Sequence, residues 1–160
     1  MNKQKKYDKL YMDLAIRIAD MSHDTDKKVG SIVVKENNIL AFGFNGMPSG
    51  MPNECKEEDG STKLEVIHAE SNAICKLAKT TSSAEGATIY CTLSPCIECA
   101  KLIIQSGITR FVFKELYKND SGIRMLLEYD KIKFAEFCKD MDKSEVITLE
   151  QLDDILKDLK

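Results

Sequence analysis

The stretch of sequence that decides the fold runs over residues 87–113, ATIYCTLSPCIECAKLIIQSGITRFVF. A β-rich run at 87–93 is followed by an apolar helical pattern at 97–107 and by a second β-rich run at 110–113. The helical pattern ends at Gly107, a residue type that favours the position just after a helix. Two strands joined by a crossover helix pair in parallel with a right-handed connection, so this stretch predicts a parallel part of a sheet.

The chain before this unit predicts an antiparallel start to the same sheet. The β-rich runs at 29–34 and 38–44 are joined by KENN at 35–38, whose adjacent asparagines favour the tight turn of a hairpin. Before this hairpin, residues 9–22 have a helical pattern with one apolar stripe. The predicted buried stripe consists of Leu10, Leu14, Ile18 and Met21, with Tyr11 and Ala15 beside them.

The remaining segments predict one long loop and further helices and strands. Residues 45–63 lose all periodicity and contain glycine and proline, so we expect a long loop, and loops of this length in compact domains usually serve function. A helical pattern follows at 69–79. The last predicted elements are a helix at 122–130, a strand at 131–137 and an amphipathic helix at 148–160 that begins with a Thr148–Gln151 capping box.

Composition narrows the class of protein. A chain of 160 residues that is 43% hydrophobic and 31% charged predicts one globular domain over residues 1–160. No apolar run approaches the ~20 residues of a membrane span, and the start MNKQKKYDKL lacks the apolar core of a signal peptide, so a cytoplasmic protein with no membrane partner is expected. The net charge of −3 argues against the broad basic surface that nucleic acid requires.

The six cysteines favour reduced thiols or metal ligation over disulfides, because no secretory signal accompanies them. Cys96 and Cys99 follow Pro95 at the start of a predicted helix, so both sulfurs lie on one face of its first turn and can reach one ion. The positive end of the helix dipole favours the thiolates that a metal needs. A C-x-x-C pair alone also fits a redox dithiol or two buried cysteines.

His68 supplies a third ligand, because it stands at the start of its own predicted helix. One imidazole and two thiolates leave the fourth position of a zinc ion open for water, which is typical of catalytic sites, whereas structural zinc takes a fourth protein ligand. Cys91 is the nearest candidate for that fourth ligand. Glu70 lies two residues after His68 and can serve as the base beside the metal. A core histidine and an acidic residue in a first helical turn are each common alone, but their combination with Cys96 and Cys99 favours one metal site.

The pattern H-x-E followed by P-C-x-x-C is typical of zinc nucleobase deaminases. Over about residues 10–135 the chain resembles the deoxycytidylate (dCMP) deaminase family. The segments that carry this resemblance are VGSIVV at 29–34, GFNGMPSG at 43–50, HAESNAI at 68–74, TLSPCIECAKLIIQSGI at 92–108 and the later LY at 116–117. The resemblance implies a cytidine deaminase-like fold, with three α/β/α layers around a central mixed sheet of five strands.

The same resemblance implies a reaction and a set of residue roles. Zinc-dependent hydrolysis would convert dCMP to dUMP and ammonia, and would supply dUMP for thymidylate synthesis. The implied zinc ligands are His68, Cys96 and Cys99, Glu70 would transfer protons, and the backbone N–H of Ala69, the carbonyl of Ser94 and the side chain of Asn45 would bind base and sugar. Tyr117 and Lys118, which follow the strand at 110–113, are the first candidates for the 5′-phosphate.

Regulation and assembly are also implied by the resemblance. Family members are often hexamers that dCTP with Mg²⁺ activates and dTTP inhibits, and effector contacts would involve Asn45 and Gly46. Cys55 is expected to be a free thiol. Two alternatives stay open: a deaminase of bases in nucleic acid, of the tRNA adenosine or single-strand cytidine type, and a zinc-stabilised module without catalysis.

Overall fold

The computed structural model describes residues 3–129, 132–136 and 147–158. Within these residues the chain forms α1 (Lys3–Ala19), β1 (Gly30–Lys35), β2 (Asn38–Phe44), α2 (Ala69–Leu77), β3 (Thr88–Leu93), α3 (Ile97–Gln105), β4 (Arg110–Glu115), α4 (Ser121–Glu128), β5 (Lys133–Glu136) and α5 (Leu149–Asp158). No helix that these residues form is both long enough and apolar enough to cross a membrane. Cys138 lies outside the described residues.

The strands form a single sheet in the order β2-β1-β3-β4-β5. β1 is antiparallel to both β2 and β3, whereas β3, β4 and β5 are parallel to one another. The predicted α/β class and the mixed character of the sheet are therefore confirmed. The parallel half follows from the crossover helices, because a strand that is left through a helix re-enters the sheet in the same direction.

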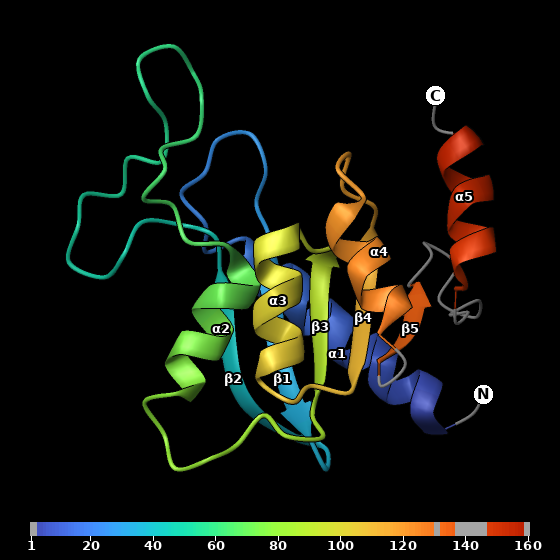
Figure 1. Ribbon diagram of the computed structural model, residues 1–160. Coiled ribbons are helices and arrows are strands. Elements are labelled where there is room, and N and C mark those ends of the chain that lie inside the picture. The colour runs from blue at the N-terminus through green and yellow to red at the C-terminus, as the bar shows by residue number, and fades with distance from the viewer. Residues whose placement is uncertain (1–2, 130–131, 137–146, 159–160) are drawn as a thin grey trace.

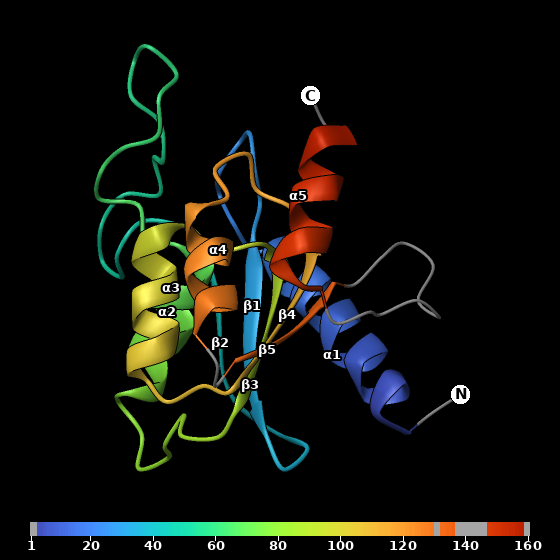
Figure 2. The ribbon, with the colours of Figure 1, turned by 45° about the vertical axis from the view of Figure 1, so that its right-hand side comes forward.

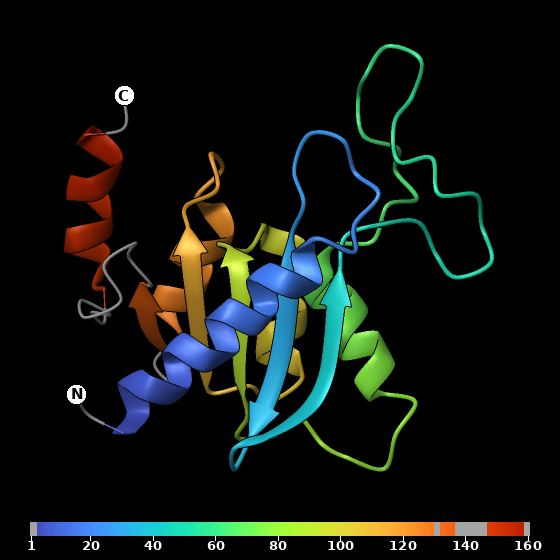
Figure 3. The same cartoon turned by 180° about the vertical axis from the view of Figure 1, so that it is seen from behind.

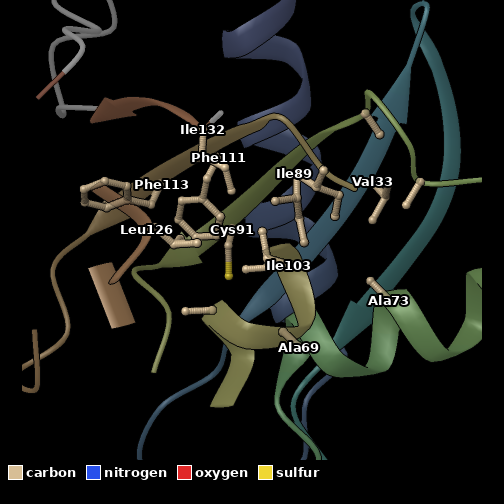
Figure 4. Close-up of a cluster of buried hydrophobic side chains, with 14 of the residues drawn as sticks. Val33, Ala69, Ala73, Ile89, Cys91, Ile103, Phe111, Phe113, Leu126 and Ile132 are labelled. Atoms are coloured by element: carbon tan, nitrogen blue, oxygen red, sulfur yellow. The ribbon is translucent and has the colours of Figure 1, made fainter. Parts of the chain in front are cut away.

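Helices cover both faces of the sheet. α1 crosses one face and contacts all of the first four strands (Figure 3). α2, α3 and α4 lie on the other face, where β1, β3 and β4 contribute side chains to a large apolar cluster (Figures 1 and 4). α5 lies beside α4 (Figure 2), and Arg124 of α4 donates a hydrogen bond of 2.6 Å to Asp153 of α5.

The buried stripe of α1 differs from the prediction. Leu10 and Met21 are largely exposed, and Met21 lies beyond the end of the helix. The physical reason is the close approach of α1 to β1 at Gly30, where a Cβ atom would collide with the backbone of Ala15 and Ala19. These two small residues must therefore face the sheet, which rotates Leu10 toward solvent. The residues that α1 buries are Asp8, Tyr11, Met12, Ala15 and Ala19.

A buried polar network joins α1 to the sheet. One carboxylate oxygen of Asp8 accepts hydrogen bonds of 2.7 Å from the Tyr90 hydroxyl and from Arg110, and the other accepts one of 2.8 Å from Arg110. Burial by itself raises the pKa of Asp8, but the hydrogen bonds from Arg110, Gln4 and Tyr90 outweigh it and hold the pKa below its usual value. This network fixes the position of α1 across β3 and β4.

Several local predictions from the sequence are confirmed. Glu36 and Asn37 both have positive φ, as a tight turn between β1 and β2 requires. Gly107 has a φ of 78° just after α3. The capping box at the start of α5 forms, since the Thr148 N–H donates to Gln151 at 2.9 Å and the Gln151 N–H donates to Thr148 at 3.2 Å. The predicted helix and strand after β4 are present as α4 and β5 within the described residues.

The long loop between β2 and α2 is present and projects from the end of the sheet at which β3 and β4 terminate (Figure 1). Its base closes where Gly46 and Ile67 exchange backbone hydrogen bonds of 3.1 and 2.9 Å. The apolar and β-branched residues of LEVI at 64–67 would by themselves predict an extended segment before His68, and this prediction is wrong in its first half. Leu64 and Glu65 form a turn, because their positions serve to return the loop to its base at Ile67.

Candidate active site

The starts of α2 and α3 lie side by side at the carboxyl end of β3 (Figure 1). His68 and Cys96 occupy the N-cap positions of these helices, and both have extended backbone conformations, with ψ of 157° and 170°. Two glycines allow the starts of α2 and α3 to pack closely against their neighbours. A Cβ atom at Gly43 of β2 would collide with the backbone of α2, and one at Gly122 of α4 would collide with the backbone at Pro95 and Cys96.

The predicted metal ligands come together as one group. Nδ1 of His68 lies 3.3 Å from Sγ of Cys96 and 3.5 Å from Sγ of Cys99, and all three ligand atoms lie within 4.8 Å of one another. A tetrahedral zinc ion with ordinary bond lengths separates a sulfur and a nitrogen ligand by roughly 3.6 Å. The observed spacings therefore fit zinc without rearrangement of the side chains.

Cys91 takes no part in this group. Among the described residues the cluster contains three ligands only, and Cys91 is fully buried in the apolar cluster, on the side of β3 that faces Ile103 (Figure 4). Burial raises the pKa of its thiol well above the usual value, which disfavours the thiolate form that zinc binds. Three protein ligands leave one tetrahedral position for a small molecule, as catalytic sites require.

The thiols of the two cysteines in the group have pKa values shifted in opposite directions. The pKa of Cys96 is lowered, because the thiol of Cys99 and the imidazole of His68 donate hydrogen bonds to its sulfur. The pKa of Cys99 is raised by the neighbouring Cys96 sulfur and by burial. The N–H of Cys99 also points at the Cys96 sulfur, at 3.4 Å. The hydrogen bonds around Cys96 therefore favour the thiolate form of its side chain, which is the form that zinc binds.

Glu70 lies in the first turn of α2 and is only 4% exposed. Burial raises the pKa of its carboxyl to about 7. The side chain lines the same cavity as His68 and Cys96 but is not one of the three ligands. A carboxyl group in this position can exchange a proton with a molecule in the cavity.

A cavity of about 160 Å³ opens beside the ligand group. Four of the six residues predicted to contact substrate or effector line it, namely Asn45, Ala69, Ser94 and Tyr117. Lys118 is exposed and does not line the cavity, and neither does Gly46. The cavity-lining residues in full are Asp24, Lys27, Val29, Asn45, Lys56, Thr62, Val66, His68, Ala69, Glu70, Leu93, Ser94, Cys96 and Tyr117.

The amide of Asn45 holds the cavity wall together. Its oxygen accepts a hydrogen bond of 2.8 Å from the Val29 N–H, and its nitrogen donates one of 2.8 Å to the Lys27 carbonyl. Ser94 has a comparable role in the cavity wall, because its hydroxyl accepts a hydrogen bond of 2.7 Å from the Tyr117 N–H. The structure thus gives both side chains a structural function in addition to any contact with a ligand.

Four polar residues that line the cavity were not predicted from the sequence. Asp24 and Lys27 come from the segment before β1, and Lys56 and Thr62 come from the long loop. The only signal in the sequence that concerns any of them is the length of the loop at 45–63, which predicts function without indicating a particular side chain.

Comparison with known proteins yields concordant matches to one family. The family profile described as "Cytidine and deoxycytidylate deaminase zinc-binding region" matches residues 5–115. The human deoxycytidylate deaminase is 34% identical in an alignment of length 145, and the match covers 83% of this chain and 80% of that protein. The deoxycytidylate deaminase of phage T4 is 34% identical in an alignment of length 154, and the match covers 69% of this chain and 79% of that protein.

A solved structure of dCMP deaminase from the cyanophage S-TIM5, in complex with dCMP and dUMP, superposes with a TM-score of 0.78 at 40% sequence identity. The match covers 84% of this chain and 98% of the cyanophage chain.

Proposed function

This chain belongs to the cytidine and deoxycytidylate deaminase family defined by that zinc-binding region, and from this membership we propose that it converts dCMP and water to dUMP and ammonia. One observation carries the proposal: the chain is similar along almost the whole length of the cyanophage enzyme that was captured with dCMP and dUMP. The cavity beside the possible zinc ligands His68, Cys96 and Cys99 supports the proposal. The chain is a hydrolytic deaminase.

His68, Cys96 and Cys99 would hold the zinc ion. When bound, zinc supplies a Lewis acid that lowers the pKa of water toward neutrality. The Glu70 carboxylate takes a proton from the attacking water and delivers it to N3 of the cytosine ring, beside the carbon that is attacked. It then transfers the second proton to the 4-amino group, which leaves as ammonia while the carbonyl of uracil forms.

The remaining roles concern how the substrate is held. We propose that the backbone N–H of Ala69 and the carbonyl of Ser94 bind the edge of the base and that Asn45 lies at the sugar. The position of these residues on the cavity wall supports the assignment. Tyr117 also lines the cavity, whereas Lys118 stays a prediction from the sequence that its exposed position does not favour.

Ammonia release from purified protein tests the proposal. We expect turnover of dCMP, and we expect Glu70→Gln to retain stoichiometric zinc while its turnover falls by orders of magnitude. An oligonucleotide that contains cytidine or adenosine serves as the competing substrate. Deamination of the oligonucleotide alone would favour the nucleic-acid alternative, and full function of Glu70→Gln would favour a zinc module without catalysis.

We also propose regulation and assembly of the family type: activation by dCTP with Mg²⁺, inhibition by dTTP and a hexamer. The resemblance in the loop that begins with Asn45 and Gly46 supports the effector assignment. Rates measured with and without each nucleotide test the regulation, and light scattering tests the assembly. The cytoplasmic location and the single domain over residues 1–160 stay predictions from the sequence.

A further inference from the structure

Lys56 is held at the cavity by three acceptors. Its ammonium lies 2.7 Å from the carboxylate of Asp26, 2.9 Å from the hydroxyl of Thr62 and 3.4 Å from the carboxylate of Asp24. An ammonium group has three N–H donors, so these contacts use all of them. The Lys56 side chain is only 19% exposed although it comes from the long loop. Its charge is therefore held in one place on the cavity wall.

The two carboxylates around Lys56 differ in how firmly they are held. Asp24 is buried, and the same oxygen that faces Lys56 accepts hydrogen bonds of 2.8 and 3.1 Å from the N–H groups of Asp26 and Lys27. The side chain of Asp26 is 66% exposed. Because exposed ion pairs contribute little and are screened by salt, Asp26 is the partner that Lys56 can exchange most easily.

The other lysine of the cavity is a weaker candidate for anion binding. Lys27 donates a hydrogen bond of 2.7 Å to Glu115, and both of these side chains are about half exposed. Lys118, the candidate from the sequence, lies outside the cavity. Among the residues that line the cavity, Lys56 is therefore the cation whose position is best defined and whose exposed partner can be replaced.

We propose that Lys56 is the residue that selects substrates with a 5′-phosphate, and that the phosphate takes the place of Asp26 on the Lys56 ammonium. This inference rests on the proposed function, because it assumes a nucleotide whose base lies at the zinc ligands. Asp24 and Thr62 keep the ammonium in position during the exchange. Asp26 is then a competing counter-ion, which a phosphate dianion displaces and an uncharged nucleoside leaves in place.

Steady-state kinetics on dCMP and on deoxycytidine, which lacks the phosphate, test this exchange. Lys56→Met is expected to lower the ratio of kcat/KM for dCMP to that for deoxycytidine by about tenfold to a hundredfold, mainly through KM, because one charge-assisted hydrogen bond is lost. Asp26→Asn is expected to raise the same ratio by about twofold to fivefold, since it removes only an exposed competitor. Lys56→Arg should retain most of the selectivity.

Lys63→Met is the matched control. Lys63 lies in the same loop, its side chain is 22% exposed, and it faces Glu54 at 3.7 Å, but it does not line the cavity. We expect it to leave the selectivity ratio unchanged. Thermal melting of every variant separates loss of folding from loss of binding, and Asp26→Asn decides the question even where Lys56→Met fails to fold.

The possible results separate this inference from the proposed function. If the wild-type protein turns over dCMP but Lys56→Met leaves the selectivity ratio unchanged, or Asp26→Asn leaves it unchanged or lowers it, the role of Lys56 is wrong and the proposed function stands. If the wild-type protein does not turn over dCMP, both are wrong.

Discussion

Gly122→Ala tests whether helix α4 supports the metal ligands. A Cβ atom at this position would collide with the carbonyl oxygen of Pro95 and with the backbone of Cys96, and neither group can rotate away as a side chain would. Relief of the collision requires a shift on the order of 1 Å between α4 and the start of α3. Overpacking of this kind costs about 1–3 kcal/mol. The better helix propensity of alanine offsets up to about 1 kcal/mol of that cost.

We therefore expect the free energy of unfolding of Gly122→Ala to fall by about 1–2 kcal/mol. A displacement of about 1 Å at catalytic groups can lower the rate on the order of a hundredfold. Urea denaturation measures the stability, elemental analysis the bound zinc, and ammonia release the rate. Ser121→Ala, one residue earlier in α4, is the control and should retain all three properties. If Gly122→Ala also retained stability, zinc and turnover, the packing of α4 on Pro95 and Cys96 would not be what positions the ligand.

Three further changes test other parts of the structure. Asp8→Asn is expected to lower the free energy of unfolding at pH 7 by about 2–3 kcal/mol, somewhat less than for a fully buried ion pair because Arg110 remains partly exposed. The folded pKa of Asp8 lies below its unfolded value of about 3.9, so its contribution is complete above that pH and is lost as the pH falls through the folded pKa. Urea denaturation of both proteins between neutral and acidic pH measures this, and a stability difference that does not shrink in acid would contradict it. Cys99→Ala is expected to lose bound zinc, because it removes a ligand. Cys91→Ala is expected to keep one zinc per chain and to lose about 1 kcal/mol of stability from the apolar cluster; elemental analysis that found zinc lost from this variant instead would make Cys91 a ligand.

The elements around the active site could be predicted because their signals are local. Alternating and helical apolar patterns mark β3, α3 and β4. The ligand group could also be predicted, because its residues lie at helix starts. His68 and Cys96 are the N-cap residues of α2 and α3, and Cys99 lies in the first turn of α3. Helices that start at the same end of a sheet bring such residues together.

The face that α1 buries could not be predicted from its own sequence. Its apolar residues offer two stripes, and the glycine that selects between them lies in β1. The residues that the long loop contributes to the cavity could not be predicted from the sequence either. Lys56 meets Asp24 and Asp26 through a contact across about 30 positions of the chain, and no periodicity within the loop marks it.

The sequence by itself determined that the chain has the residues of a zinc-dependent deaminase. The metal ligands and the helix starts that carry them are each recognisable from a few neighbouring residues. Only the tertiary structure decided which carboxylate is buried, which lysine faces the cavity and how closely the helices approach the sheet. These properties depend on distances between segments that are remote in the chain, and such distances are set by packing rather than by any local pattern.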